Sequence, residues 1–184
     1  QKKGWDAVNG LIKTSKEKDT ISITLNGAKV LPATVLSEIK GKDISLNLDM
    51  ENGFIWKING TSITAETPAD IDLSVTNTEE YIPAALYSLI STNQNDFGFH
   101  LGRNGAFDFP AVLSVKADAS CAGLMANLFW YDVENGVLQC IQSVTVGGAF
   151  ERSIPYADFT LSKGQDYFIA FGTESLNGRV IHTD

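Results

Sequence analysis

The chain has 184 residues, 43% of them hydrophobic, and a formal net charge of −8. This length suits one large domain or two small ones, and it buries roughly 70% of the surface that the unfolded chain exposes. Because an acidic body repels phosphate and no apolar run reaches the ~18 residues of a membrane span, we expect neither nucleic acid binding nor membrane insertion.

A helix is expected close to the N-terminus. In "GWDAVNGLIKTSK", Trp5, Val8 and Ile12 recur three and four residues apart and share one helical stripe, so Trp5 is interpreted as a packing residue. Residues 1–42 carry eight Lys and four acidic side chains, a net charge of +4, whereas the remaining 142 residues carry a net charge of −12. We interpret these lysines as an ordinary solvated face.

The next elements follow a weakly repeated order of strand, helix and strand over residues 20–58 and 70–115. Each short helix begins with Pro at the first helical position, in "LPATVLSEIKG" and in "IPAALYSLI". Within the first repeat, "ISLNLDMENGFIWKI" predicts a hairpin whose three-residue loop is 51–53, a type I turn with a left-handed Gly53. This loop pairs Leu48 with Trp56 on the buried face and predicts that Trp56 is structural.

A second Asn-Gly hairpin is expected at "FGFHLGRNGAFDF", with loop 103–105. Its register sets Phe99 against Phe109 in the core and His100 against Asp108 on the polar surface. The plain interpretation of His100 and Asp108 is a cross-strand polar pair. The functional interpretation is a pair of hydrogen-bonding groups for a sugar hydroxyl.

The residues after 105 alternate as strands, one of which is expected at "AFERSI", and "ANLFWYDVENGVLQC" contains three adjacent aromatic residues. Because successive side chains of a strand point to opposite faces, the three rings cannot share one core. A three-residue loop 134–136 pairs Trp130 with Cys140 and Leu128 with Gln142 on the core side. The same register sets Tyr131 opposite Gln139 on a mixed face that also carries Phe129. Either other elements cover Phe129 and Tyr131, or these rings form a surface that stacks on sugars or binds a partner.

These signals predict a mainly β (α+β), β-sandwich-like fold made of antiparallel hairpins with three-residue x-Asn-Gly turns. Two or three short helices are expected to pack on the N-terminal half. We expect a single module over residues 1–184, with a strand and helix half at about 1–105 and an antiparallel β half at about 106–184. The chain opens on Gln1 without an apolar signal segment, which predicts a processed form or an excised piece of a longer protein.

The search for reactive motifs favours a non-enzymatic protein. Nucleophile-elbow, zinc-protease, phosphate-loop and dinucleotide-binding patterns are absent from the sequence. The spacing of Cys121 and Cys140 matches no zinc motif, so no metal or other cofactor is expected. Cys140 is interpreted as a buried apolar residue, with a single disulfide as the alternative.

The order of the motifs resembles a known β-rich module. The segments "GWDAVNGLI", "IKGKDISLNLDMENGFIWKING", "NGAFDFPAVLSV" and "DYFIAF" carry the resemblance, which spans nearly the whole chain. The module recurs in secreted and cell-surface proteins of anaerobic, polysaccharide-degrading gut bacteria, some of which carry dockerins or carbohydrate-binding modules. Arg103 and "SKGQDYFIAF" depart from the family, which has His at both places. The resemblance implies an extracellular setting and a structural role for Trp56.

Three functions follow as hypotheses. The first is a non-catalytic module that binds plant glucan, starch-type before cellulose-type, through Phe129, Tyr131, Gln139, His100 and Asp108. The second is a structural or adhesion spacer that contacts neighbouring domains of a surface protein, and the third is a small glycoside hydrolase. A monomer is expected in each case.

Overall fold

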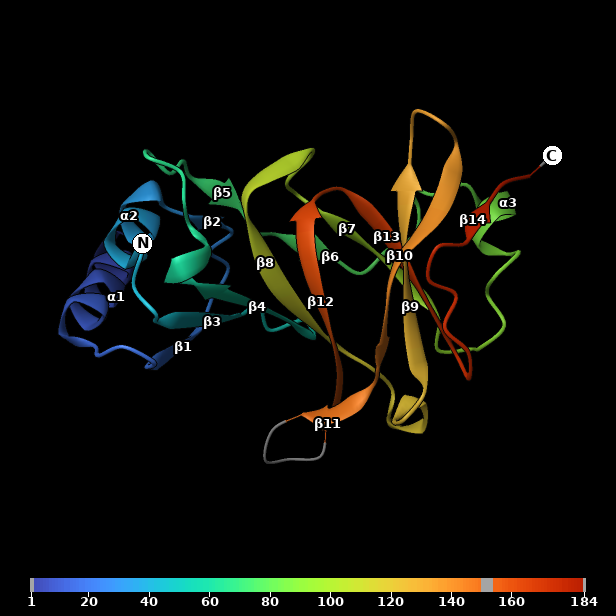
Figure 1. The fold of residues 1–184 in the computed structure, drawn as a ribbon, viewed down its shortest axis with the longest axis horizontal. Helices are drawn as coiled ribbons and strands as arrows, with labels where there is room; N and C mark the ends of the chain where they lie inside the picture. Colours follow the sequence, from blue (N-terminus) through green and yellow to red (C-terminus); the bar gives the residue numbers. More distant parts are fainter. Residues whose placement is uncertain (1, 150–153, 184) are drawn as a thin grey trace. The chain divides into compact units, whose positions relative to one another are not determined.

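The computed structural model describes residues 2–149 and 154–183 and is mainly β (Figure 1). The α-helices are α1 (Lys2–Thr14), α2 (Ala33–Ile39) and α3 (Ala84–Tyr87). The strands are β1 (Thr20–Thr24), β2 (Val30–Leu31), β3 (Ser45–Asp49), β4 (Phe54–Asn59), β5 (Ile71–Asp72), β6 (Val75–Thr76), β7 (Phe97–Leu101), β8 (Ala106–Lys116), β9 (Met125–Asp132), β10 (Val137–Thr145), β11 (Gly147–Ala149), β12 (Ile154–Lys163), β13 (Asp166–Gly172) and β14 (Val180–Ile181). The predicted mainly β, α+β class is confirmed.

The strands of the described residues form two six-stranded sheets and one two-stranded ribbon. The first sheet has the order β1-β3-β4-β8-β12-β11, the second has the order β14-β10-β9-β13-β7-β6, and β2 pairs with β5. β1 and β3 are parallel. The pairs β3–β4, β9–β10, β9–β13 and β7–β13 are antiparallel. Two large sheets of this kind are what a β-sandwich-like fold requires.

The chain divides into two compact units, which are described separately. Unit 1 comprises residues 1–74, 102–114 and 160–164, and unit 2 comprises residues 75–101, 115–159 and 165–184. Each unit therefore takes segments from both halves of the sequence. The expectation of one module over residues 1–184 stays a prediction.

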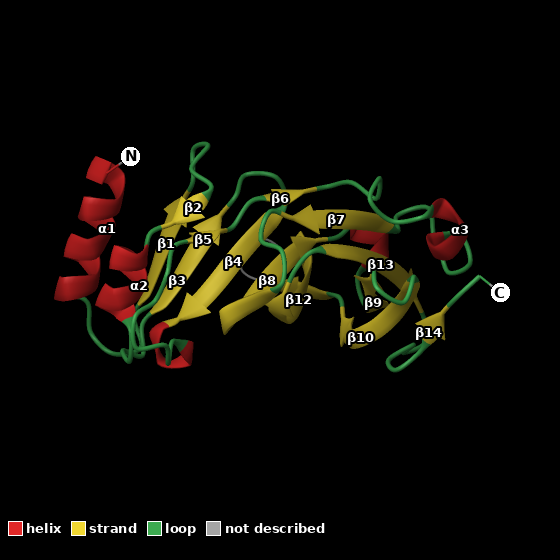
Figure 2. Cartoon of the chain, turned by 90° about the horizontal axis from the view of Figure 1, so that it is seen from above, coloured by secondary structure: helices red, strands yellow, loops and turns green. Residues whose placement is uncertain are grey.

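In unit 1, α1 and α2 lie side by side (Figure 2). Val8 and Ile12 of α1 are buried, as the helical stripe predicts, and Trp5 is half-buried. Pro32 is the N-cap of α2, one residue before the predicted position, and it offers no side-chain cap. The carboxylate of Asp70 instead accepts the Ala33 N–H at 2.6 Å, so a distant loop satisfies this helix terminus.

The β3–β4 hairpin has the predicted register. Leu48 pairs with Trp56, and the Met50 N–H donates to the Phe54 carbonyl at 3.0 Å. Gly53 has a φ of +91°, but Glu51 also has a positive φ, +64°. The predicted type I turn is therefore wrong, because it requires negative φ at Glu51. The register nevertheless agrees with the prediction, because both strands alternate buried and more exposed side chains and only this register places the buried ones on the same face.

Trp56 is confirmed as a structural residue of unit 1. Its side chain is 1% exposed, and its Nε1–H donates to the Leu73 carbonyl at 2.9 Å. The ring of Phe107 meets the indole edge-on, with centroids 6.1 Å apart. Burial of the indole is therefore compatible with its polar N–H, which has a backbone partner.

In unit 2, α3 covers one face of the second sheet. Ile82, Leu86 and Ile90 pack against Phe129 and Phe168 in one buried cluster. On the opposite face Phe99 stacks on Tyr167, with ring centroids 5.1 Å apart. Two helices thus belong to the N-terminal strands, as predicted, whereas α3 packs on strands from the C-terminal half of the sequence.

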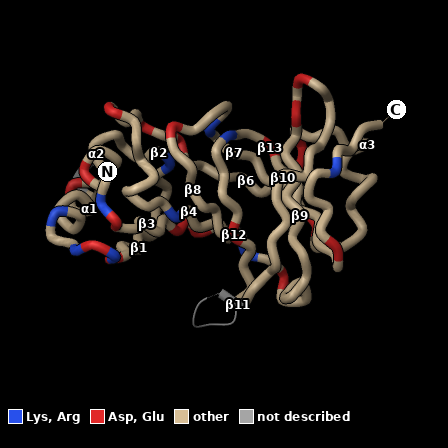
Figure 3. The backbone as a smooth tube through the Cα atoms, in the orientation of Figure 1, with Lys and Arg blue, Asp and Glu red and all other residues tan. Residues whose placement is uncertain are grey.

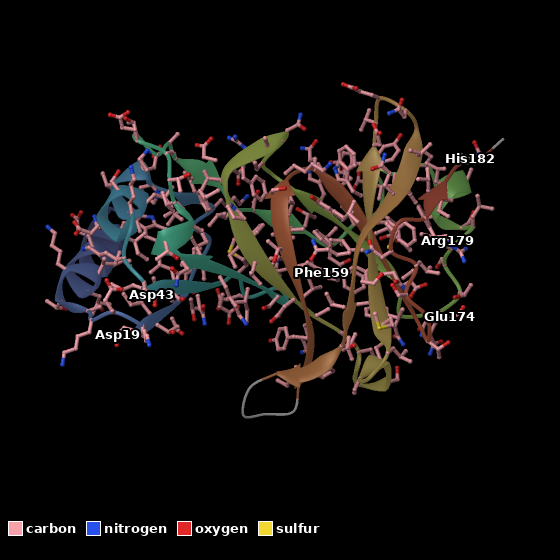
Figure 4. The ribbon with its side chains drawn as sticks, viewed as in Figure 1. Asp19, Asp43, Phe159, Glu174, Arg179 and His182 are labelled. Carbon is pink, nitrogen blue, oxygen red and sulfur yellow. The ribbon has the colours of Figure 1, made fainter. Side chains whose placement is uncertain are left out.

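The C-terminal segment is tied to β9 and β10. The buried Asn127 side chain donates to the Glu174 carbonyl at 3.1 Å and accepts the Leu176 N–H at 2.8 Å. The Arg179 carbonyl accepts the Cys140 N–H at 2.8 Å. Figure 4 shows Glu174, Arg179 and His182 along this segment.

The sequence interpretation missed strand β12. Its side chains alternate between buried and more exposed positions over residues 154–163, with Ala157 and Phe159 inside. This alternation is the usual signal of a half-buried strand. The strand expected at "AFERSI" lies mostly outside the described residues.

Candidate functional site

The predicted aromatic surface on β9 is wrong for Phe129. The loop has four residues, 133–136, because Asp132 pairs with Val137, and Phe129 therefore lies opposite Cys140. Both residues are buried beneath α3, and Tyr131 packs half-buried against the same cluster. The alternative interpretation, in which another element covers these rings, is confirmed, and the covering element is α3.

Trp130 and Gln139 are paired with each other, rather than with the predicted partners. Trp130 is half-buried, so the prediction that it enters the core with Cys140 is wrong. The Gln139 amide donates to the Asp132 carboxylate at 3.3 Å. That carboxylate also accepts the Asn135 amide at 2.7 Å, which makes Gln139 part of a turn network.

The predicted pairing of His100 with Asp108 is also wrong. β7 and β8 belong to different sheets, so loop 103–105 joins two sheets instead of closing a hairpin. Asp108 is exposed on β8 in unit 1. His100 lies opposite Asp166, the first residue of β13, in unit 2.

His100 is the centre of a polar and aromatic cluster, which we call the Tyr81 site and which consists of Tyr81, His100, Gln165 and Asp166. The His100 Nδ1 and the Asp166 carboxylate lie 2.8 Å apart, and the Gln165 amide nitrogen lies 3.4 Å from His100 Nε2. The Tyr81 ring lies across the imidazole, with centroids 4.3 Å apart and planes inclined by 31°. Tyr81 itself is 53% exposed.

Gly98 explains why the loop carrying Tyr81 approaches β7. Gly98 and His100 point to the same face of the strand. A Cβ atom at Gly98 would lie 2.8 Å from the Glu79 Cβ and 3.1 Å from the Thr78 carbonyl oxygen. The Gly98 N–H also donates to the Glu79 carboxylate at 3.4 Å. Loop 77–81 therefore rests on bare backbone, and this contact holds Tyr81 beside His100.

The hydrogen bonds of the site fix one tautomer of the neutral imidazole. Nδ1–H donates to the Asp166 carboxylate, which leaves Nε2 to accept an N–H from Gln165. Burial raises the pKa of the Asp166 carboxyl above its usual 3.8, although the hydrogen bond from His100, and the positive charge that the imidazole carries when it is protonated, oppose this shift. The cluster thus offers a carboxylate, an imidazole and an amide beside an exposed ring.

The sequence interpretation identified one member of the site, His100, and missed Tyr81, Gln165 and Asp166. In the sequence, Asp166 stands directly before the apolar run "YFIAF", and this position only weakly indicates that its carboxylate belongs to a site. The pairing of β7 with β13 joins residues far apart in the chain, and no turn pattern announces it. Gly98 within "DFGFH" was the available signal of a close backbone approach.

Among the described residues, no three His, Cys, Asp or Glu side chains converge as they would around a metal ion. Cys121 and Cys140 are buried free thiols, and burial raises the pKa of each. In the part of the chain that the structure describes, no helix combines the length and apolar character needed to cross a bilayer.

Comparison with protein-family models, curated proteins and solved structures found no match for this chain.

Proposed function

We propose that the chain is a non-catalytic glucan-binding module of an extracellular bacterial protein, and that the Tyr81 site contacts the sugar. The observation that carries the proposal is the exposed Tyr81 ring, which lies against His100 beside hydrogen-bonding groups. Sugars present flat C–H faces to aromatic rings, and their hydroxyls pair with amide, imidazole and carboxylate groups. Gln165, His100 and Asp166 are these groups.

A starch-type α-glucan is favoured over cellulose. Among the described large hydrophobic side chains that are strongly exposed, Tyr81 is the single aromatic residue. A flat cellulose surface would be matched by several coplanar exposed rings. A flexible α-glucan chain can instead wrap one ring and its neighbouring polar groups.

The surroundings of His100 support binding rather than hydrolysis. Glycosidases use two carboxyl groups that face each other across the substrate, about 5–9.5 Å apart. Here the buried Asp166 carboxylate is directed at His100. The Gln165 amide lies beside Nε2, where a nucleophile activated by the His–Asp pair would have to stand.

Calorimetric titration with malto- and cello-oligosaccharides tests the proposal. We expect heat of binding with the malto-oligosaccharide, and a loss of about fivefold or more in affinity for Tyr81→Ala, because one stacking ring contributes on the order of 1 kcal/mol. Leu89→Ala is the matched control, since Leu89 also lies in unit 2, is exposed to a similar extent and lies outside the site. Absence of binding to both sugars at millimolar concentration would overturn the proposal.

A structural spacer is the second candidate. Three aliphatic side chains of unit 2, Leu89, Val133 and Val180, are more than half exposed, and exposed apolar surface is used in contacts between domains. This candidate predicts that neither the malto- nor the cello-oligosaccharide gives heat of binding. It also predicts that incubation with either sugar releases no reducing ends.

A further inference from the structure

The dipeptide Asn-Gly occurs seven times in the chain, with the asparagine at positions 9, 26, 52, 59, 104, 135 and 177. Asparagine is a thermolabile residue, and a glycine that follows it has no side chain to shield the backbone nitrogen. That nitrogen can attack the asparagine side-chain amide within the same chain, and such an intramolecular attack is strongly favoured when the geometry permits it. Each Asn-Gly pair is thus a candidate for spontaneous deamidation, and the fold decides which pair can react.

Three of the pairs have a glycine N–H that is already hydrogen-bonded. The N–H groups of Gly60, Gly136 and Gly178 donate, at distances of 3.0, 2.8 and 2.9 Å, to the carbonyls of Ile44, Asp132 and Cys140. Ring closure requires the glycine nitrogen to turn toward the asparagine side chain. In these pairs the turn must first break a backbone hydrogen bond, which slows the reaction.

Three further pairs are restrained by their surroundings. Asn9 lies inside α1, where ring closure would require the helix to unwind. The pair that begins at Asn104 is tied to a neighbouring segment, because the Gly164 N–H donates to the Gly105 carbonyl at 2.9 Å. Asn52 lies in the β3–β4 turn, which a backbone hydrogen bond closes across its base. Six of the seven pairs are therefore held in place.

The remaining pair, Asn26 and Gly27, follows the end of β1, and both residues are exposed. The neighbouring backbone hydrogen bonds are made by the Leu25 N–H and the Lys29 carbonyl. Within the described residues, neither the Asn26 side chain nor the Gly27 N–H has a hydrogen-bond partner. A Cβ atom at Gly27 would meet nothing within 4 Å, so the space around this nitrogen is open.

We propose that Asn26 is the site at which the folded chain deamidates. The Gly27 nitrogen forms a bond to Asn26 Cγ, the Cγ–Nδ2 bond breaks, and Nδ2 leaves as ammonia with the proton that Gly27 has lost. Water then opens the five-membered ring at Cγ, which gives aspartate, or at the backbone carbonyl carbon, which gives isoaspartate. The sequence of steps consumes one water, releases one ammonia and adds one negative charge, without oxidation or reduction.

The reaction changes the surface at the end of β1. Asn26 lines a pocket of about 200 Å³ together with Trp5 and Val8 of α1, so the product places a carboxylate beside apolar side chains. Isoaspartate also lengthens the main chain by one atom. Charges of both signs already lie along the chain between α1 and β1 (Figure 3), and one more exposed carboxylate is compatible with the fold. The reaction is independent of glucan binding, because Asn26 lies in unit 1 and the Tyr81 site lies in unit 2.

Peptide mapping by mass spectrometry tests the proposal, after incubation of the folded chain in ¹⁸O-labelled water at mildly alkaline pH. We expect the Asn26 peptide to take up the label as a mixture of isoaspartate and aspartate. Its conversion should be about tenfold or more faster than that of any other Asn-Gly pair, which corresponds to about 1.4 kcal/mol in activation free energy. In the denatured chain, where the restraints are lost, the seven pairs should react at similar rates.

Asn26→Gln is the test variant, because its longer side chain would have to close a six-membered ring. It should abolish the early acidic product that ion-exchange chromatography resolves from the wild type. Asn104→Gln is the matched control and should leave that product unchanged. Equal or faster conversion at any other pair of the folded wild type would overturn the proposal. Aspartate without isoaspartate at position 26 would also overturn it, because water would then have attacked the side chain directly.

Discussion

The Tyr81 ring lies across the His100 imidazole, with the two ring centroids 4.3 Å apart. The Nδ1 atom of the same imidazole contacts the Asp166 carboxylate. Three separate segments of unit 2 therefore meet at one position: the loop after β6, strand β7, and the start of β13. None of these segments would form the site alone. The contacts between them are what the following variants probe.

Gly98→Val should disturb the site without touching any of its members. The new side chain meets the Glu79 Cβ, so loop 77–81 must shift and carry Tyr81 away from His100. We expect a loss of about 1–3 kcal/mol in the free energy of unfolding, as for overpacked sites, together with weakened glucan binding. Urea unfolding and calorimetric titration measure the two effects. Gly172→Ala is the control, because a Cβ there meets nothing within 4 Å; equal behaviour of the two variants would contradict the close-approach argument.

Asp166→Asn should change the pH dependence of stability. The folded-state pKa of Asp166 is raised above 3.8 by burial, so its contribution to stability is present below that value and is lost as the pH rises through the raised pKa. The Asn variant lacks this loss while its amide oxygen still accepts the His100 Nδ1–H. Urea unfolding between about pH 4 and pH 7 should therefore show a smaller decline for the variant than for the wild type. Burial also raises the pKa of Asp96, so some decline persists; a steeper decline in the variant would refute the assignment.

Trp56→Phe should be markedly destabilising. The substitution leaves a cavity in the core of unit 1 and deprives the buried Leu73 carbonyl of its donor. The combined cost is about 2–4 kcal/mol in the free energy of unfolding. Trp130→Phe, at a half-buried position, should cost less. Denaturant unfolding of both variants decides the order, and the reverse order would show that Trp56 is not the structural anchor.

The two thiols should be protected in the folded chain. Cys121 and Cys140 are buried, and burial raises the pKa of both groups, which keeps the reactive thiolate scarce. A chromogenic disulfide reagent should react slowly with the native chain and should titrate both thiols after denaturation without reductant. If the denatured chain yields no thiol, the two residues form a disulfide and the free-thiol structure is wrong.

The hairpins separate what local pattern can and cannot predict. The β3–β4 register follows from adjacent strands with a shared buried face. For β9–β10 the same argument predicts that Trp130 points into the core and Phe129 away from it. The loop has four residues instead of three, so Phe129 points into the core and Trp130 lies on the other face. The predicted pairing of Leu128 with Gln142 nevertheless holds, because a bulge between Cys140 and Gln142 compensates for the longer loop. An extra residue inside a strand leaves no distinct mark in the apolar alternation.

The sequence by itself determined the mainly β class, the buried face of the β3–β4 hairpin, the stripe of α1 and the structural role of Trp56. Each of these depends on side chains only a few residues apart, where spacing decides which face is buried. Tertiary structure decided that β7 leaves β8 to join β13, that α3 covers Phe129, and that Tyr81, His100, Gln165 and Asp166 meet. These contacts join distant segments, and their formation depends on which sheets and helices best bury their apolar faces together, a choice that no local pattern encodes.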